Sequence, residues 1–63
     1  MKIEDDIIIR NHCWIMTRST ILPGIELGEC TAVAAHSVVT KSFEGYELIG
    51  GIPARTIRSL NKR

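Results

Sequence analysis

Aliphatic residues recur at every sixth position over most of this chain. Seven consecutive six-residue units begin with an aliphatic side chain, at Ile3, Ile9, Ile15, Ile21, Leu27, Val33 and Val39. An α-helix spaces apolar residues about 3.6 apart, and a half-buried strand spaces them 2 apart. The six-residue period therefore predicts neither an ordinary helix nor an ordinary amphipathic strand.

The fifth position of each unit is mostly small or β-branched. These positions are Ile7, Cys13, Ser19, Ile25, Thr31, Ser37 and Phe43. A small side chain permits a sharp corner, so each unit is typical of a short strand followed by a turn. Three such units per turn make a triangular coil of parallel strands whose first residues point toward the axis.

Residues 18 apart in such a coil stack in neighbouring turns, about 4.8 Å from each other. The predicted ladders are Ile3 with Ile21 and Val39, Ile9 with Leu27, and Ile15 with Val33. The predicted fold class is all-β, a left-handed parallel β-helix of about two to two and a half turns. A small β-sandwich or hairpin stack built from residues 13–17 and 37–41 is the alternative.

The regular period ends after Val39 and is followed by residues that favour turns. These are Gly45, Gly50, Gly51 and Pro53. Because proline is favoured in the first turn of a helix, we expect a short helix over residues 54–60 that caps the coil. The prediction is one domain, with the β-helix at residues 1–44 and a C-terminal loop and capping helix at residues 45–63.

Charge is divided unevenly along a chain whose net charge is +1. Residues 1–50 hold four basic and seven acidic side chains, whereas residues 51–63 hold four basic side chains and no acidic one. A small net charge argues against a nucleic-acid-binding domain, which usually carries a large basic excess on one face. The basic end is either a solvated terminus or an anion site.

A chain of 63 residues forms one small domain and buries only about 60% of its unfolded surface, so oligomeric partners are expected. The first turn of the coil opens at Met1 and should leave an unpaired edge, so this end is interpreted as cut. The chain has two cysteines and no signal peptide, which predicts a reducing, cytoplasmic setting. It contains no apolar run of 18 residues, so no membrane span is predicted.

The segments CWI, ILPGIELGE, SVVTKSF and GGIPARTI occur in an order that resembles the C-terminal half of the hexapeptide-repeat acetyltransferases. This family contains galactoside, maltose, serine, chloramphenicol (xenobiotic type) and polysaccharide O-acetyltransferases. The resemblance covers nearly the whole chain. The ordered series of segments is far more specific than an isolated six-residue unit.

The resemblance implies a homotrimer of β-helical prisms, with acetyl-CoA in the groove between adjacent subunits. It also implies a histidine general base that takes a proton from the acceptor hydroxyl or amine as this group attacks the thioester. In the family this histidine precedes the CWI segment. No catalytic residue is therefore assigned here, and a truncated enzyme with little or no turnover is expected.

Six positions match the family's CoA-contacting positions. They are Thr17 and Ala35 along the pantetheine arm, Thr40 and Lys41 near the nucleotide, and Arg55 and Arg58 after the Pro-Ala pair. Converging arginine and lysine side chains suit phosphate groups on chemical grounds as well, which gives the basic end a function.

Three residues replace glycines that are frequent in the family, namely Arg10, Met16 and His36. Glycine permits positive φ and close approach of the backbone. Met16 is expected to narrow the pantetheine channel. His36 is expected to be strained unless it adopts another φ.

The remaining histidine and cysteine residues predict no further site. His12 and His36 are separated by one turn plus one side of the coil, so they should project from different sides and form no zinc site. His12 and Cys30 should stack in one column, a spacing compatible with a Cys-His nucleophile pair that lacks an orienting acid. Cys13 is predicted to be a core residue, and both thiols are predicted to be free.

Two functions remain open at this point. One is an acetyl-CoA-dependent acyltransferase acting on an oxygen or nitrogen of a small molecule or sugar, or its truncated remnant. The other is a non-catalytic oligomeric structural or interaction module that pairs through its exposed edge. Stabilisation by CoA would separate the two.

Overall fold

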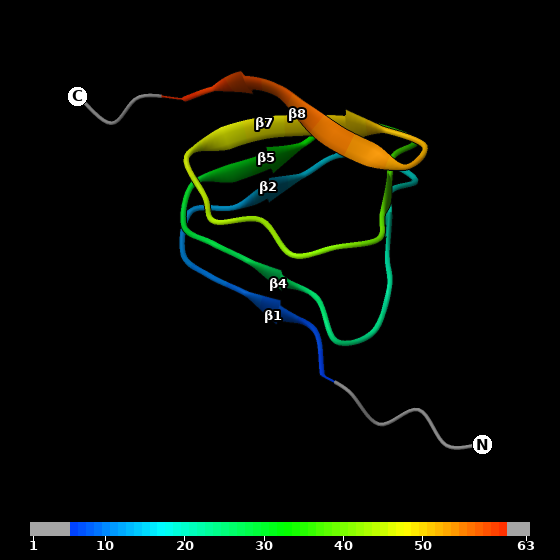
Figure 1. Cartoon of the computed structure of the whole chain (residues 1–63), viewed down its shortest axis with the longest axis horizontal. Coiled ribbons are helices and arrows are strands. Elements are labelled where there is room, and N and C mark those ends of the chain that lie inside the picture. The colour runs from blue at the N-terminus through cyan, green and yellow to red at the C-terminus, as the bar shows by residue number, and fades with distance from the viewer. Residues whose placement is uncertain (1–5, 61–63) are drawn as a thin grey trace.

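The chain folds into a coil of short strands stacked one turn above another (Figure 1). The structure, a computed structural model, describes residues 6–60. The strands are β1 Ile8–Ile9, β2 Trp14–Ile15, β3 Thr20–Ile21, β4 Glu26–Leu27, β5 Thr31–Val33, β6 Val38–Val39, β7 Glu47–Gly51 and β8 Ala54–Ser59. The first six strands have only two or three residues, because each side of the coil and its corner share one six-residue unit.

Strands that lie one turn apart along the chain pair in parallel, β1 with β4, β2 with β5 and β3 with β6. Their inward residues are Cα partners, Ile9 with Leu27, Ile15 with Val33 and Ile21 with Val39. These predicted ladders are therefore confirmed. The prediction for Ile3 lies outside the described residues.

The core is a column of aliphatic side chains along the axis of the coil. Leu27, Val33, Val39 and Ile49 are completely buried. Ile9 occupies the same inward place one turn earlier and is 45% exposed. In the second turn, β5 lies between β2 and β7, and Leu27 of β4 is bridged by Phe43, whereas within the described chain the strands of the first turn pair only with the second turn.

Small polar side chains at the fifth position of the units form hydrogen bonds at the corners of the coil. Thr31 Oγ1 donates a hydrogen bond to Gly28 O at 2.7 Å, and Cys13 Sγ donates to the same carbonyl at 3.2 Å from the turn below. Cys13 is half-buried and packs against the core, as predicted. Cys13 and Cys30 are both free thiols, which confirms the second part of that prediction.

Ser37→Ala is expected to lower the free energy of unfolding by about 1–3 kcal/mol, because the substitution removes both hydrogen bonds of a completely buried hydroxyl group. Ser37 Oγ donates to Ala34 O at 2.7 Å and accepts from Gly51 N at 3.1 Å. The matched control is Ser19→Ala, which removes one 3.0 Å hydrogen bond to the same Ala34 carbonyl. Urea unfolding measures both variants, and equal losses would contradict this role of Ser37.

The corners of the coil are built on left-handed backbone. Positive φ angles occur at Gly24 (81°) and at His12 (63°), Arg18 (62°), Cys30 (58°), His36 (62°) and Tyr46 (52°). A left-handed residue other than glycine costs on the order of 1–2 kcal/mol. His36 does not adopt another φ, so the expected strain is present, and the 3.0 Å hydrogen bond from His36 N to Thr17 O helps to offset it.

The third turn is shorter than the first two. Phe43 bridges Leu27, and β7 pairs with β5 so that Ile49 lies opposite Val33. Partners in a regular coil are 18 residues apart, whereas Phe43 and Ile49 each follow their partner by two residues fewer. Phe43 therefore stacks on an inward residue and does not occupy the fifth position of a regular unit. The period ends after Val39, as predicted, because the next corner is shorter.

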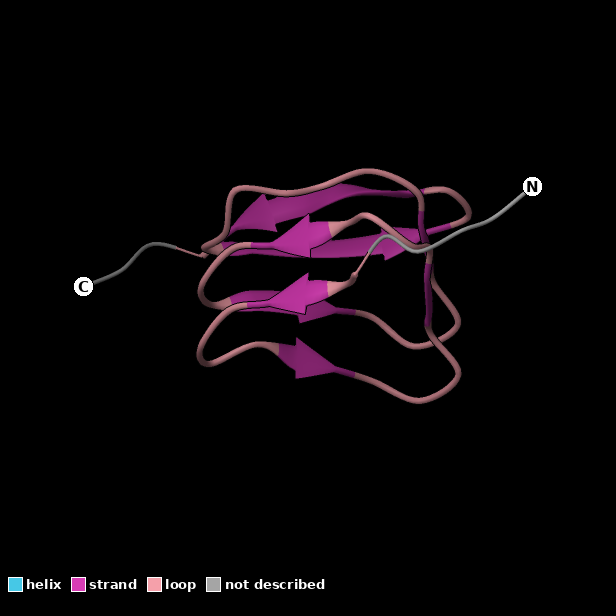
Figure 2. Cartoon of the chain, turned by 90° about the horizontal axis from the view of Figure 1, so that it is seen from below, coloured by secondary structure: helices cyan, strands magenta, loops and turns pink. Residues whose placement is uncertain are grey.

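Residues 54–60 form no helix, so that part of the predicted fold is wrong. Figure 2 shows only strands and loops in the described chain. The segment instead contains β8, which runs antiparallel to β7 at the end of the sheet β2-β5-β7-β8. The open edge of β7 supplies hydrogen-bond partners, and the β-branched Thr56 and Ile57 favour a strand. Ala54 is buried in the core, so the segment still covers this end of the coil.

Candidate functional site

Thr17 and Ala35 lie on adjacent turns, at the corner that follows β2 and β5. The 3.0 Å hydrogen bond from His36 N to Thr17 O joins the two turns at this point. Both side chains are small and exposed, so they leave the backbone of this edge accessible. An extended ligand with amide groups can hydrogen-bond to such a backbone. The structure thus brings together the two residues predicted for the pantetheine arm.

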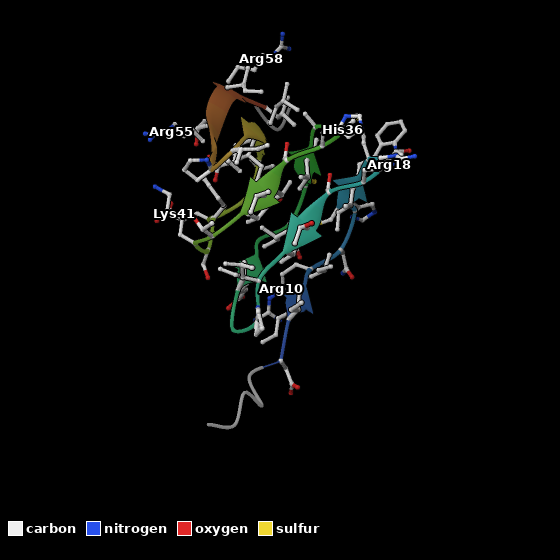
Figure 3. All side chains as sticks on the ribbon, turned by 90° about the vertical axis from the view of Figure 1, so that its right-hand side faces the viewer. Arg10, Arg18, His36, Lys41, Arg55 and Arg58 are labelled. Atoms are coloured by element: carbon white, nitrogen blue, oxygen red, sulfur yellow. The ribbon has the colours of Figure 1, made fainter. Side chains whose placement is uncertain are left out.

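Arg18 and His36 extend the same edge toward solvent. They lie one turn apart along the chain, and both are exposed and left-handed. Figure 3 shows their side chains close together on one side of the coil. Sequence reasoning missed Arg18, although its spacing of one full turn from His36 was a usable signal. Arg18 adds a positive charge beside the Thr17 and Ala35 corner.

Thr40 and Lys41 lie at the following corner, directly after β6. Both side chains are exposed. Lys41 Nζ lies 5.5 Å from the centroid of the Phe43 ring, a cation–π distance. This contact holds the lysine beside the short corner of the third turn while its ammonium group remains accessible.

Arg55 and Arg58 lie on β8, opposite Gly50 and Leu48 of β7. In a helix the two arginines would lie on one face, three residues apart. In β8 the pairing register shifts between the partners of Leu48 and Ile49, so the two arginines lie on either side of an irregularity in the strand. Figure 3 shows Arg58 at the top of the coil and Arg55 on the side where Lys41 lies.

The six predicted CoA residues consequently fall into separate groups. Thr17 and Ala35 share one corner, Lys41 and Arg55 lie on the other side in Figure 3, and Arg58 lies apart from both. Within residues 6–60, none of these three cations forms an ion pair. Their charges are available to an anionic ligand.

Arg10 is the cation that the described chain neutralises. Its Nη2 atom lies 2.7 Å from Glu26 Oε2, and its Nε atom donates to the same oxygen at 2.7 Å. The pair joins the first turn to the second. Arg10 is thus a structural residue at this position and not part of the candidate site.

The histidines and cysteines assemble no catalytic or metal centre in the described part of the chain. His12 and His36 lie at different corners, as predicted, and no group of three metal-binding side chains occurs there. Cys30 N donates to Asn11 O at 3.1 Å, so Cys30 and His12 do follow one column. No hydrogen bond joins their side chains among residues 6–60.

The described surface of a single chain forms no enclosed pocket. Exposed residues, including Met16 beside Thr17, surround the Thr17 and Ala35 corner. A ligand on this edge would need a second surface to enclose it.

In the part of the chain that the structure describes, no helix has the length and apolarity needed to cross a membrane.

Comparisons with known proteins identify similar chains and similar coils. The sequence profile described as bacterial transferase hexapeptide (six repeats) matches residues 6–41. The chain is 42% identical over 53 residues to a chloramphenicol acetyltransferase from Agrobacterium fabrum, covering 84% of this chain and 25% of the relative. It is 37% identical over 57 residues to the galactoside O-acetyltransferase of Escherichia coli, covering 90% and 28%.

The same coil occurs in solved structures. A hexapeptide-repeat acetyltransferase from Vibrio cholerae, complexed with acetyl-CoA, superimposes with a TM-score of 0.89 at 38% identity, covering 92% of this chain and 32% of that chain. A maltose O-acetyltransferase from Clostridium difficile gives a TM-score of 0.89 at 31% identity, covering 92% and 31%. The predicted left-handed β-helix is confirmed. The chain spans about a quarter to a third of the length of these relatives.

Proposed function

This chain belongs to the bacterial transferase hexapeptide family, and we propose on that premise that it takes part in acetyl transfer from acetyl-CoA. The acceptor would be a hydroxyl or amino group of a small molecule or sugar. The main support is the match over 92% of the chain to a coil whose protein is complexed with acetyl-CoA. The acetyltransferase names of the other relatives agree with this reaction type.

The role proposed for residues 6–60 is to hold CoA. The pantetheine arm would lie along the backbone edge at Thr17 and Ala35, where the side chains are small. The phosphates would be bound by Lys41, Arg55 and Arg58, since none of these is engaged in an ion pair within the described residues. The separation of the cations suits a ligand that carries phosphates at more than one point.

We assign the general base to a part of the enzyme outside residues 6–60. The family resemblance places that histidine before the CWI segment, and His12 and His36 are held at separate corners of the coil. A general base contributes roughly 10²–10⁴-fold to the rate, so residues 6–60 alone would give little turnover. Binding of CoA, rather than catalysis, is the appropriate assay.

A homotrimer would supply the second surface that the site requires. The outward positions of the sheet β2-β5-β7 include Trp14, which is 70% exposed and lies opposite Ala32, and Ala32 in turn lies opposite Leu48. A large aromatic side chain exposed on an apolar face of a sheet favours packing against another subunit. We place the protein in the cytoplasm, where a reducing setting would keep its two thiols free.

Arg55→Ala combined with Arg58→Ala is expected to abolish the thermal stabilisation that CoA gives to the unaltered chain. CoA at about 100 times its dissociation constant stabilises the folded chain against unfolding by about 2.7 kcal/mol. For a domain of this size that is a rise in melting temperature of roughly 10 °C or more. Differential scanning fluorimetry with and without CoA measures the shift, and light scattering on the same samples reports the oligomeric state.

Arg10→Gln is the matched control for that experiment. It removes a cation of the same type, but one that is paired with Glu26 and lies near the opposite end of the coil from Arg58 (Figure 3). The control should keep the full CoA shift. A double variant that is stabilised by CoA as strongly as the control would rule out the phosphate assignment.

The non-catalytic interaction role remains a second candidate because of one observation. Ile9 and Ile15, two inward residues of the first turn, are exposed, although their partners Leu27 and Val33 in the second turn are completely buried. Oligomerisation that is indifferent to CoA would favour this role over acetyl transfer.

A further inference from the structure

Arg18 and His36 place two hydrogen-bond donors at the corner that also holds Thr17 and Ala35. The 3.0 Å hydrogen bond from His36 N to Thr17 O fixes His36 one turn of the coil from Arg18. Both residues are exposed and have a φ of 62°, so the two turns repeat one corner conformation. Figure 3 shows the two side chains close together. We call Arg18 and His36 the donor pair.

The side chains of the donor pair are not used elsewhere in the described structure. Arg10, on the same turn as Arg18, is held by Glu26 at 2.7 Å. Among residues 6–60, by contrast, no ion pair or side-chain hydrogen bond involves Arg18 or His36. A guanidinium group offers five N–H donors in a planar fork, and a neutral imidazole offers one. These donors are therefore available to a ligand.

The other two corners of the coil do not carry an arginine at the left-handed position. The corner after β1 and β4 has His12 and Cys30 there, and the corner after β3 has Gly24. The corner conformation thus accepts glycine, histidine or cysteine and does not itself require an arginine. Arg18 distinguishes the Thr17 and Ala35 corner from the others.

The donor pair also lies apart from the cations to which we assign the CoA phosphates. In Figure 3 Arg18 and His36 lie on one side of the coil, and Lys41 and Arg55 lie on the other. The pantetheine arm joins the phosphates of CoA to its thioester. If the phosphates are on the Lys41 side, the thioester end of the arm is the end nearer the donor pair.

We propose that the donor pair binds an anionic group, a carboxylate or a phosphate ester, of the molecule that receives the acetyl group. The acceptor would be an acidic sugar or a similar small acid. Arg18 would grip the anion with its planar fork, and His36 would donate one N–H without needing to be protonated. This inference rests on the proposed function and names the substrate class of the same site.

The donor pair would fix the acceptor and take no part in the bond changes. The oxygen or nitrogen of the acceptor bonds to the acetyl carbon, and the carbon–sulfur bond of the thioester breaks. The proton of the acceptor passes by way of the general base to the sulfur of CoA. Arg18 and His36 are accordingly specificity-determining residues, whose loss should change acceptor binding and leave CoA binding intact.

Nuclear magnetic resonance titration of the ¹⁵N-labelled chain, saturated with CoA, tests the proposal. The probes are glucuronate, glucose 6-phosphate and glucose, which share a sugar ring and differ in their anionic group. Sodium chloride keeps the ionic strength equal in all titrations. The two anionic sugars should shift the amide signals of Arg18 and His36. They should bind about tenfold or more tightly than glucose, because hydrogen bonds to a charged group are strong.

Variants of the donor pair separate charge from shape. Arg18→Gln should lower the affinity for both anionic sugars to that for glucose, whereas Arg18→Lys keeps the charge and should retain part of the preference. His36→Ala should weaken binding by about threefold or more. The matched control is His12→Ala, which alters an exposed histidine of nearly the same φ, 63°, at another corner and should have no effect.

Differential scanning fluorimetry of the same variants with and without CoA distinguishes this inference from the proposed function. All of them should keep the full CoA shift. Equal affinities of the three sugars, or equal effects of His36→Ala and His12→Ala, would overturn this inference alone. Loss of the CoA shift in Arg18→Gln would also overturn it, because Arg18 would then hold CoA itself. Absence of a CoA shift in the unaltered chain would overturn the proposed function, and the acceptor role with it.

Discussion

Gly28→Ala is expected to leave most of the chain unfolded at 25 °C. A Cβ atom at position 28 would overlap the backbone carbonyl of Glu44 and lie 2.9 Å from Gly45 N. Gly28 N also donates to Phe43 O at 2.9 Å, so the two segments cannot separate without losing this hydrogen bond. We expect a loss of about 3 kcal/mol or more, comparable with the whole stability of a domain of this size.

Gly24→Ala is the matched control for that substitution. Gly24 has a φ of 81° and is exposed. A left-handed alanine should cost only about 1–2 kcal/mol, and five residues other than glycine already have a positive φ among residues 6–60. Thermal unfolding followed by circular dichroism measures both variants. Similar melting temperatures would show that the third turn moves aside easily.

Leu27→Ala is expected to cost about 2–5 kcal/mol of unfolding free energy, because Leu27 is completely buried at the centre of its ladder. Ile9 lies below it and Phe43 above it. The substitution would leave a cavity that its rigid neighbours in adjacent turns cannot fill. Chemical denaturation with a common slope for all variants measures the loss.

Ile9→Ala occupies the same inward position one turn earlier and provides the comparison. Because Ile9 is almost half exposed, its truncation should cost no more than about 1 kcal/mol. If Ile9→Ala proved as damaging as Leu27→Ala, the first turn would already be covered in solution.

The candidate site could be predicted only where it follows the period of the coil. Thr17 and Ala35 are separated by one full turn, so their stacking followed from the same arithmetic as the core ladders. Arg55 and Arg58 lie beyond the period, and their relative directions depend on whether the segment is a helix or a strand. Lys41 depends in turn on the shortened corner that places Phe43 beside it.

The sequence by itself determined the triangular coil and its ladders. Aliphatic residues that recur every six positions do not follow the period of a helix or of a flat strand, so neither structure would bury them all on one face. The local pattern is therefore sufficient to specify the coil. The ladders at Ile9 with Leu27 and Ile15 with Val33 follow from that spacing alone.

Only the tertiary structure decided the third turn and the last strand. The shorter spacing of β7 on β5 depends on the close contact of Gly28 with the chain at Glu44. The predicted helix over residues 54–60 rested on weak local preferences, a preceding proline and two apolar residues. The open backbone edge of β7 outweighed them, because a strand placed there satisfies polar groups that a helix would leave without partners.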